Sequence, residues 1–374
     1  MVWRKTSIFL NYINKKFIIK VKNMTEYYEN NLYKTEIKEI VNYSLLDILK
    51  DKVFVIAGAR GMICSELIDT IMYANLNYGL NCKIYGIVRN MQAAEYRFKA
   101  YKKSIYFQLV QADINKDVIN IDKDVDFFIQ GASNTHPVYY SIYPIDTILT
   151  NTVGTNRMLE FASKHRCKRF LFLSSVEVYG ENRGDIDKFT EGYLGYLNCN
   201  TLRAGYSEAK RLGEALCQAY IAEKGLDCVI PRIARAYGAG LLKEDSKALS
   251  QFIHNALKGE DIVLKSKGDQ FYSYVYIADI VSALLFLIAN GKTGEAYNLS
   301  GIESDITLAK LADYIANFVG TRVVYDIPSE QEAAGYSKAT KAILDTKKIE
   351  NLGWHSRYSI REGIKRTLQI QGIN

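Results

Sequence analysis

The pair Tyr206 and Lys210 is the feature of this sequence that most directly suggests chemistry. The two residues stand four positions apart at the start of an apolar-periodic run that continues through Leu212, Leu216 and Tyr220. On a helix, side chains with this spacing lie one above the other on one face. A lysine ammonium near a phenol stabilises the phenolate and lowers the tyrosine pKa from its usual value of about 10. We therefore expect Tyr206 to act as a general acid and base and Lys210 to tune it.

A glycine turn provides the context that this pair needs, because the spacing alone arises by chance in a chain with 28 tyrosines. The apolar run 53–57 has strand length, glycines follow it, and an apolar-periodic helix pattern begins after them. Gly58 permits a tight turn, and Gly61 lets a pyrophosphate approach the helix N-terminus. Cys64 stands where a third glycine is usual, and its small size still permits close strand–helix packing. The alternative is an ordinary strand–helix turn, but we expect a dinucleotide to contact Gly58, Arg60, Gly61, Met62 and Ile63.

The ends of the next two strand patterns bear on the identity of the dinucleotide. The strand pattern 83–88 is followed by Arg89, without the acidic residue that would hold a ribose 2′-hydroxyl. Arg89 and Arg60 could instead meet a 2′-phosphate, so NADP remains an alternative to NAD. After the third strand pattern, Asp113, with Ile114 beside it, suits the adenine edge of the cofactor. Asp113 could equally cap a turn.

A serine at a strand end is the third motif. The segment 174–180, SSVEVYG, follows an apolar strand pattern at residues 169–173. In doubly wound α/β folds, ligands bind outside the carboxyl ends of the strands. We therefore expect Ser175 to lie at the edge of the sheet where a ligand binds.

Alternating strands and helices must position these motifs. Short apolar runs of strand length recur up to residue 230, with helical patterns between most of them: residues 53–57, 83–88, 105–110, 125–129, 169–173 and 227–230. Continuous apolar strands are buried on both faces, which is typical of a parallel sheet covered by helices. We predict an α/β fold with a Rossmann-type doubly wound parallel sheet.

The pattern loosens near Tyr237 and predicts a smaller, interleaved C-terminal α/β lobe. Helical patterns cover residues 246–258, 278–289, 308–319 and 360–369, and strand-like runs cover residues 261–264 and 273–277. Before the first strand, residues 26–49 predict one or two helices packed on the outside. We expect three parts: an N-terminal extension over residues 1–50, a dinucleotide-binding domain over residues 51–236, and a mainly substrate-binding lobe over residues 237–374.

Positive charge is concentrated at the N-terminus. The 374 residues carry a formal net charge of +7, and residues 1–23 hold six basic side chains and no acidic one: Arg4, Lys5, Lys15, Lys16, Lys20 and Lys22. Subtracting these six charges leaves +1, which predicts no nucleic-acid surface on the remaining chain. The apolar run 7–12 is too short for a signal-peptide core or a transmembrane span. We expect a loose tail or a translation start at Met24, with a membrane-surface or targeting segment as the alternative.

Composition predicts a globular protein, because 48% of the residues are hydrophobic and the chain is long enough to bury a large core. The cysteines form no Cys-x-x-Cys pair, and no metal-ligand spacing joins them to the four histidines. We expect no metal site, a cytoplasmic location and six free thiols: Cys64, Cys82, Cys167, Cys199, Cys217 and Cys228.

Taken together, the glycine turn, the strand-end serine and Tyr-x-x-x-Lys resemble the extended short-chain dehydrogenase/reductase family. Within it, the chain resembles the NAD-dependent nucleotide-sugar epimerases, dehydratases and decarboxylases. The resemblance covers about residues 51–370 and includes further motifs at residues 151–155, 231–238, 272–279 and 352–354. It implies NAD as cofactor, a nucleoside-diphosphate sugar as substrate and a homodimer joined through the helices after Asn151 and Tyr206.

The resemblance also implies a role for each motif residue. Tyr206 would accept the proton of a sugar hydroxyl while hydride passes to the nicotinamide. Lys210 would hold the nicotinamide ribose and lower the Tyr206 pKa, and Ser175 would hydrogen-bond the reacting oxygen. The cofactor would be lined by Ala132, Ser133 and Asn151. Thr135 would lie near the substrate.

Glu177 is implied to act after oxidation, because a ketone acidifies the neighbouring C–H and opens elimination, decarboxylation or epimerisation. In the dehydratases and decarboxylases of the family, a glutamate two residues before the motif tyrosine acts next to the ketone. The 4,6-dehydratases place an aspartate just before it, where this chain has Val176. Valine cannot donate a proton, which argues against an ordinary 4,6-dehydratase. The alternative for Glu177 is a solvent-facing or helix-capping carboxylate.

Arg235 and Tyr272 depart from the family pattern. The family usually has an asparagine before Tyr-Gly, where this chain has Arg235, and an arginine before Ser-Phe or Ser-Tyr, where it has Tyr272. These changes weaken the resemblance to decarboxylases and suggest a remodelled pocket for the diphosphate or the sugar. We expect both residues to bind substrate.

Three hypotheses for function remain. The first is an enzyme that transiently oxidises a nucleoside-diphosphate sugar and returns the hydride. The second is a reductase that consumes NADPH on a keto-sugar nucleotide, which Arg89 would suit. The third is a non-catalytic dinucleotide-binding scaffold, against which the presence of Ser175, Tyr206 and Lys210 argues. NAD that stays bound to the purified protein would indicate the first hypothesis, in which hydride returns to the same sugar. Stoichiometric oxidation of NADPH would indicate a reductase.

Overall fold

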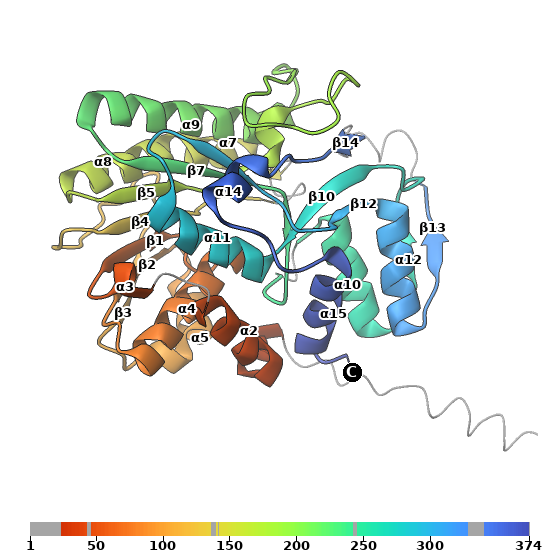
Figure 1. The fold of residues 1–374 in the computed structure, drawn as a ribbon, viewed down its shortest axis with the longest axis horizontal. Helices are drawn as coiled ribbons and strands as arrows, with labels where there is room; N and C mark the ends of the chain where they lie inside the picture. The colour runs from red at the N-terminus through yellow and green to blue at the C-terminus, as the bar shows by residue number, and fades with distance from the viewer. Residues whose placement is uncertain are drawn as a thin grey trace, which may run out of the picture.

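The structure is a computed structural model that describes residues 24–42, 46–135, 140, 142–241, 245–327 and 340–373. The basic leader at residues 1–23 and its expected role lie outside the described residues. Figure 1 shows a large sheet covered by helices on both sides, with a smaller lobe beside it.

The large sheet is the predicted doubly wound parallel sheet. Its strands follow the order β3-β2-β1-β4-β5-β7-β11, neighbouring strands in this order are parallel, and the short β6 pairs with β7, also in parallel. The strands are β1 (Val53–Ala57), β2 (Lys83–Val88), β3 (Phe107–Gln111), β4 (Phe127–Gln130), β5 (Arg169–Phe172), β6 (Ser174–Ser175), β7 (Cys228–Ile233) and β11 (Ala296–Leu299). The predicted strands are confirmed within two residues at most ends, whereas β11 was not predicted.

Alternate residues of β1 face two different hydrophobic layers. Phe54 and Ile56 join the layer that contains α4 and α11, whereas Val55 and Ala57 join the layer that contains α8 and α9. This alternation follows from the two-residue period of a strand, and Figure 1 shows the helices on opposite sides of the sheet. The helices are α4 (Met62–Tyr78), α5 (Met91–Arg97), α7 (Pro144–Leu149), α8 (Thr155–Lys164), α9 (Ala204–Lys224) and α11 (Ile277–Asn290).

The N-terminal extension packs against the main body through α2. Besides α2 (Asn31–Asn42), it contains the 3-10 helix η1 (Met24–Glu29) and α3 (Leu46–Leu49). Helix α2 contacts α4, α11 and α15. Glu36 is buried and accepts a hydrogen bond of 2.6 Å from the hydroxyl of Tyr276 in the smaller lobe. Burial raises the pKa of Glu36 to about 7. The hydrogen bond to Tyr276 means that polar as well as apolar contacts anchor this helix.

The smaller lobe contains two small sheets. In the first, β10 pairs with β8 and β14 in parallel and with β12 antiparallel; in the second, β9 pairs with β13 in parallel. Its strands are β8 (Arg235–Tyr237), β9 (Ile262–Leu264), β10 (Phe271–Tyr276), β12 (Asp305–Thr307), β13 (Val323–Tyr325) and β14 (Lys341–Ala342). Its helices are α10 (Ala248–Lys258), α12 (Leu308–Val319) and α15 (Ile360–Ile370), and α14 (Lys347–Leu352) contacts β11.

The chain crosses between the two parts more than once. After β8 and β10 have entered the smaller lobe, α11 and β11 return to the large sheet, where β11 pairs with β7. The predicted interleaving is confirmed, and a single linear boundary at residue 236 stays a proposal. Among the described residues, no helix is long and apolar enough to cross a membrane.

Candidate functional site

Helix α9 holds Tyr206 and Lys210 against the large sheet. Both side chains are buried, and Lys210 Nζ donates a hydrogen bond of 2.7 Å to the carbonyl oxygen of Leu173, just beyond β5. Gly213 allows the helix this close to the sheet, because a Cβ there would lie 2.3 Å from the Phe172 ring. The lysine is therefore fixed at the carboxyl end of the central strands.

Ser175 lies beside Tyr206 at the same strand end. Its side chain caps the 3-10 helix η4 (Val176–Tyr179), where the Ser175 oxygen accepts a hydrogen bond of 3.2 Å from the Glu177 amide. A hydrogen bond with Ser175 also lowers the pKa of Tyr206. The structure therefore brings together Ser175, Tyr206 and Lys210, as the sequence predicts.

The pKa of Tyr206 differs in direction from the sequence-based expectation. Burial of the phenol raises this pKa above 10, the Ser175 hydrogen bond opposes the shift, and the Glu177 carboxylate adds to it. Lys210 Nζ lies 6.0 Å from the centre of the Tyr206 ring and is not among the causes. Burial also lowers the pKa of Lys210 to about 8. The expected lowering of the Tyr206 pKa by Lys210 is therefore not found in this structure, where burial of the phenol sets the direction of the shift.

Tyr140 is a neighbour of Tyr206 that the sequence analysis missed. The two rings are stacked, with centroids 5.1 Å apart and planes inclined by 16°. The Tyr140 hydroxyl donates a hydrogen bond of 3.4 Å to the carbonyl oxygen of Thr135, which links the exposed Thr135 to the Tyr206 region. Nothing in the spacing around Tyr140 distinguished it from the other tyrosines.

Glu177 and Arg203 form a partly exposed ion pair at the start of α9. Arg203 Nη2 lies 3.5 Å from Glu177 Oε2, and each side chain keeps about three tenths of its surface exposed. The Glu177 charge also raises the pKa of Tyr206, so the carboxylate acts electrostatically on the phenol. Arg203 was not among the predicted site residues.

Arg235 and Tyr272 contact each other on the first sheet of the smaller lobe. The Arg235 guanidinium carbon lies 3.4 Å from the centre of the Tyr272 ring, a cation–π contact. Arg235 Nη1 is buried without a hydrogen-bond partner among the described residues. Because β8 follows β7 directly and pairs with β10, this contact lies where the two parts of the molecule meet.

The glycine turn has the predicted strand–turn–helix geometry. Gly58 adopts a φ of 75°, which favours glycine, and Gly61 is the N-cap of α4 without a side-chain cap. Cys64 stands at the position of a third glycine, and the space for its side chain is left by Gly131. A Cβ on Gly131 would lie 2.4 Å from Cys64 Sγ. Met62 and Ile63 are partly buried at the helix start, and Arg60 is exposed.

Residues of two other strand ends approach this turn. A Cβ on Gly58 would lie 2.8 Å from the backbone of Ala132, so the segment after β4 passes directly over the turn. Ser133 follows Ala132 and is partly buried. Asn151 is fully buried in the π-helical segment η3 (Thr150–Gly154), and its Oδ1 has no hydrogen-bond partner among the described residues.

Arg89 and Asp113 have partners within the protein. Arg89 Nη1 forms an ion pair of 3.1 Å with Asp146, and Nη2 donates to Asn134 Oδ1 at 3.2 Å. Asp113 Oδ1 accepts a hydrogen bond of 3.0 Å from the Asn115 amide. This contact is the one expected if Asp113 caps a turn. Ile114 is buried, where a Cβ on Gly154 would meet it at 2.8 Å. Ile114 thus packs beneath η3.

The sequence match decides the family. Residues 54–300, more than half of the chain, match the family described as "NAD dependent epimerase/dehydratase family". The chain belongs to this family. The resemblance to extended short-chain dehydrogenase/reductases is confirmed, and the protein is an enzyme of the NAD dependent epimerase/dehydratase family.

Relatives of this family member include several decarboxylases. UDP-glucuronic acid decarboxylase 5 of Arabidopsis thaliana is 29% identical over 309 residues, which cover 83% of this chain and 86% of the relative. UDP-glucuronic acid decarboxylase 1 of Danio rerio is 32% identical over 258 residues, which cover 68% of this chain and 60% of the relative. The dTDP-glucose 4,6-dehydratase of Bacillus anthracis in complex with NAD has the same fold, with a TM-score of 0.70, 20% identity and coverage of 85% and 96%.

The residues of the glycine turn fit the NAD that the family description names. The N-terminus of α4 has no side-chain cap, so its free amides suit a pyrophosphate. Asn151 Oδ1 in η3 is a buried acceptor without a hydrogen-bond partner in the described part of the chain. Arg89 is held by Asp146 and Asn134 rather than free for a 2′-phosphate. The expectation of NAD is thus confirmed for the family, and the structure gives the NADP alternative no support.

Proposed function

We propose that this enzyme oxidises a nucleoside-diphosphate sugar transiently with NAD and returns the hydride to the same molecule. The observation that carries this proposal is the grouping of Ser175, Tyr206 and Lys210 at one strand end of the large sheet. Relatives named for UDP-glucuronic acid and dTDP-glucose support a nucleotide-sugar substrate. Bound NAD would accept a hydride from a sugar carbon and give it back.

In this proposal, Tyr206 takes the proton from the sugar hydroxyl as the carbon is oxidised and returns it when the ketone is reduced. Ser175 hydrogen-bonds the same oxygen and fixes its position relative to the phenol. Lys210, held by the Leu173 carbonyl with its Nζ 6.0 Å from the centre of the Tyr206 ring, is proposed to supply positive charge near the forming phenolate. Because burial raises the pKa of Tyr206, such charge stabilisation is required for proton transfer at neutral pH.

Decarboxylation is the product-forming step that we propose first. A carboxylate two carbons from the new ketone is a β-keto acid, which loses carbon dioxide without a protonated leaving group. Glu177 acts electrostatically on Tyr206 and is proposed to act next to the ketone, whereas Val176 is buried and cannot protonate a leaving hydroxyl. The decarboxylase relatives support the same step. UDP-glucuronate is therefore the first substrate to test.

Arg235 and Tyr272 are proposed to bind an anionic group of the substrate. The family arginine expected at residue 272 is replaced by a ring, and a guanidinium from the neighbouring strand lies on that ring. In this proposal, the positive charge of the substrate site comes from β8 rather than from β10. A diphosphate, with several oxygen acceptors, suits a guanidinium that lacks a partner at Nη1.

A panel of sugar nucleotides tests the proposed function. UDP-glucuronate, UDP-glucose and the corresponding CDP-, GDP- and dTDP-sugars are incubated with enzyme and NAD and followed by mass spectrometry. We expect UDP-glucuronate to lose one carbon dioxide, and Tyr206→Phe to bind NAD without turnover. Loss of one water would indicate dehydration instead, and an unchanged mass with altered retention would indicate epimerisation. Stoichiometric oxidation of NADPH with a keto-sugar nucleotide would support the reductase.

We also propose a cytoplasmic homodimer. Exposed apolar side chains gather on α7, η3 and α9, three elements that contact one another. They include Ile145, Ile148, Leu149, Val153 and Leu212. A second copy would cover this face, and sedimentation of Leu212→Glu against wild type would test it. The cytoplasmic location is supported by the six free cysteines.

A further inference from the structure

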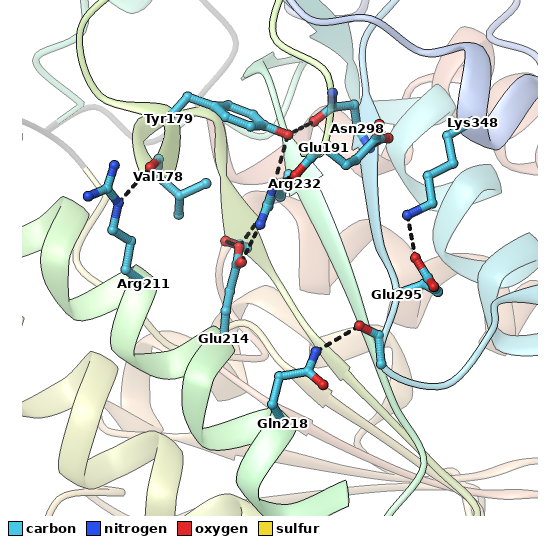
Figure 2. Close-up of polar contacts among 12 residues, drawn as sticks. Val178, Tyr179, Glu191, Arg211, Glu214, Gln218, Arg232, Glu295, Asn298 and Lys348 are labelled. Carbon is cyan, nitrogen blue, oxygen red and sulfur yellow. Dashed lines mark hydrogen bonds and ion pairs between the residues drawn. The ribbon is translucent and has the colours of Figure 1, made fainter. Parts of the chain in front are cut away.

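Glu214 is a largely buried carboxylate on α9, one helical turn beyond Lys210. Arg232 of β7 binds it through two hydrogen bonds, from Nε to Oε1 at 2.9 Å and from Nη2 to Oε2 at 2.6 Å (Figure 2). The two side chains are only 13% and 14% exposed. A buried bidentate pair of this kind fixes the carboxylate in one orientation.

Ser174 connects this carboxylate to the strand end that carries Ser175. The Ser174 hydroxyl donates a hydrogen bond of 2.6 Å to Glu214 Oε1. Strand β6 pairs with β7 so that Ser174 lies opposite Arg232. Helix α9, with Tyr206 and Lys210, is thus tied to the segment that holds Ser175.

The third nitrogen of the Arg232 guanidinium, Nη1, also has partners. Arg232 Nη1 donates to the Tyr179 hydroxyl at 3.0 Å and to the Glu191 carbonyl at 2.8 Å. The Tyr179 hydroxyl in turn donates to Asn298 Oδ1 at 2.6 Å, and Figure 2 shows these groups converging. Every nitrogen of the guanidinium is thus engaged, and the network ties β7 to α9 and to the segments that hold Tyr179 and Glu191.

We propose that Glu214 is a positioning residue that keeps Lys210 in its ammonium form and holds the Ser175 strand end against Tyr206. The inference rests on the proposed function for the role of these residues in turnover. Glu214 is separated from the reacting oxygen by Lys210 and Ser174, so it acts through them.

The charges around Lys210 support this role. Burial lowers the pKa of Lys210 to about 8, and Glu214 is the largest of the influences that raise it. The other titratable groups that act on the ammonium are Cys217 on α9 and Cys64 on α4. Burial raises the pKa of the Cys64 thiol to about 12, so that thiol is neutral. The Glu214 carboxylate is therefore the anion that favours protonated Lys210.

NAD titrations test the electrostatic part independently of any sugar. Affinity is measured by calorimetry from about pH 6.5 to about pH 9.5, on both sides of the Lys210 pKa of about 8, for wild type, Glu214→Gln and the exposed control Glu223→Gln. If the ammonium holds the cofactor, wild-type affinity weakens as Lys210 loses its proton. The midpoint is the pH at which half of this loss of NAD affinity has occurred. We expect Glu214→Gln to lower the midpoint by about one pH unit, and Glu223→Gln to leave it unchanged.

Superimposable midpoints for wild type and Glu214→Gln would overturn the proposal, as would a uniform loss of affinity without a shift. If Glu214→Gln does not fold, Glu214→Asp must shift the midpoint in the same direction by a smaller amount. The variant Ser174→Ala keeps the ion pair, so it should lower turnover with an unchanged NAD midpoint. If wild type turns over no sugar nucleotide while the midpoint still shifts, the proposed function fails and the Glu214 role stands.

Discussion

Two arginines three residues apart have opposite surroundings. Arg232 ends in a buried network in which Glu214, Tyr179 and the Glu191 carbonyl engage every donor nitrogen. Arg235, just across the junction into β8, lies on the face of Tyr272 and has a buried Nη1 without a partner among the described residues. Among the residues that the structure describes, an ion pair neutralises Arg232, and none is found for Arg235.

The comparison shows how burial and pairing distinguish a charge that stabilises the fold from a charge that is available to bind a ligand. A buried ion pair costs desolvation energy that only good geometry recovers, and the bidentate contact of Arg232 with Glu214 provides that geometry. A buried donor left unpaired costs about 1–3 kcal/mol. A protein that keeps such a donor at a junction between sheet and lobe can recover this cost when an anionic ligand binds there.

The largest expected effect is on stability, from Arg232→Met. Removing the guanidinium leaves the Glu214 carboxylate buried and unpaired, so we expect the free energy of unfolding to fall by about 3–5 kcal/mol. The matched control, Arg235→Met, removes no ion pair and should change it by less than about 1 kcal/mol. Denaturant titration of the three proteins provides the measurement. Equal losses for both variants would remove the distinction between the two arginines.

The second expected effect is on ligand affinity, from Arg235→Met. A hydrogen bond to a charged group is worth about 1.5–3 kcal/mol, so the Kd for UDP should rise by about tenfold to a hundredfold. Calorimetry at low and high salt provides the measurement, and the loss should be larger at low salt. An unchanged Kd would mean that Arg235 does not face the diphosphate.

The smallest expected effect comes from the ring beneath Arg235. A cation–π contact is worth about 0.5–2 kcal/mol, so Tyr272→Leu should weaken UDP binding by roughly two- to thirtyfold. Tyr272→Phe retains the ring and should bind UDP almost as wild type does. A loss of the same size in both variants would assign the effect to the Tyr272 hydroxyl rather than to the stacked ring.

Much of the fold could be predicted from the sequence. Apolar runs of strand length alternate with helical patterns, and the structure confirms six of these runs as strands of the large sheet. Strand β11 escaped prediction because the polar Asn298 interrupts its short apolar run. That side chain is buried because Tyr179, Phe189 and Asp345 provide its hydrogen-bond partners, which no local pattern reveals.

The site was predictable where its residues lie in short motifs and unpredictable where distant segments meet. The resemblance of these motifs to the family was enough to group Ser175, Tyr206 and Lys210. It could not show that Tyr140 stacks on Tyr206, or that Arg89 is paired with Asp146, because each contact joins segments far apart in the chain. The direction of the Tyr206 pKa shift also depends on burial, which residue spacing does not give.

The central claim is that hydride leaves and returns to the same sugar. UDP-glucuronate deuterated at C4, the carbon β to the carboxylate carbon, tests it directly with enzyme and NAD. We predict a product that has lost carbon dioxide and retains the deuterium, with no net formation of reduced cofactor. Deuterated NADH released in step with product, or a product without the label, would contradict the account.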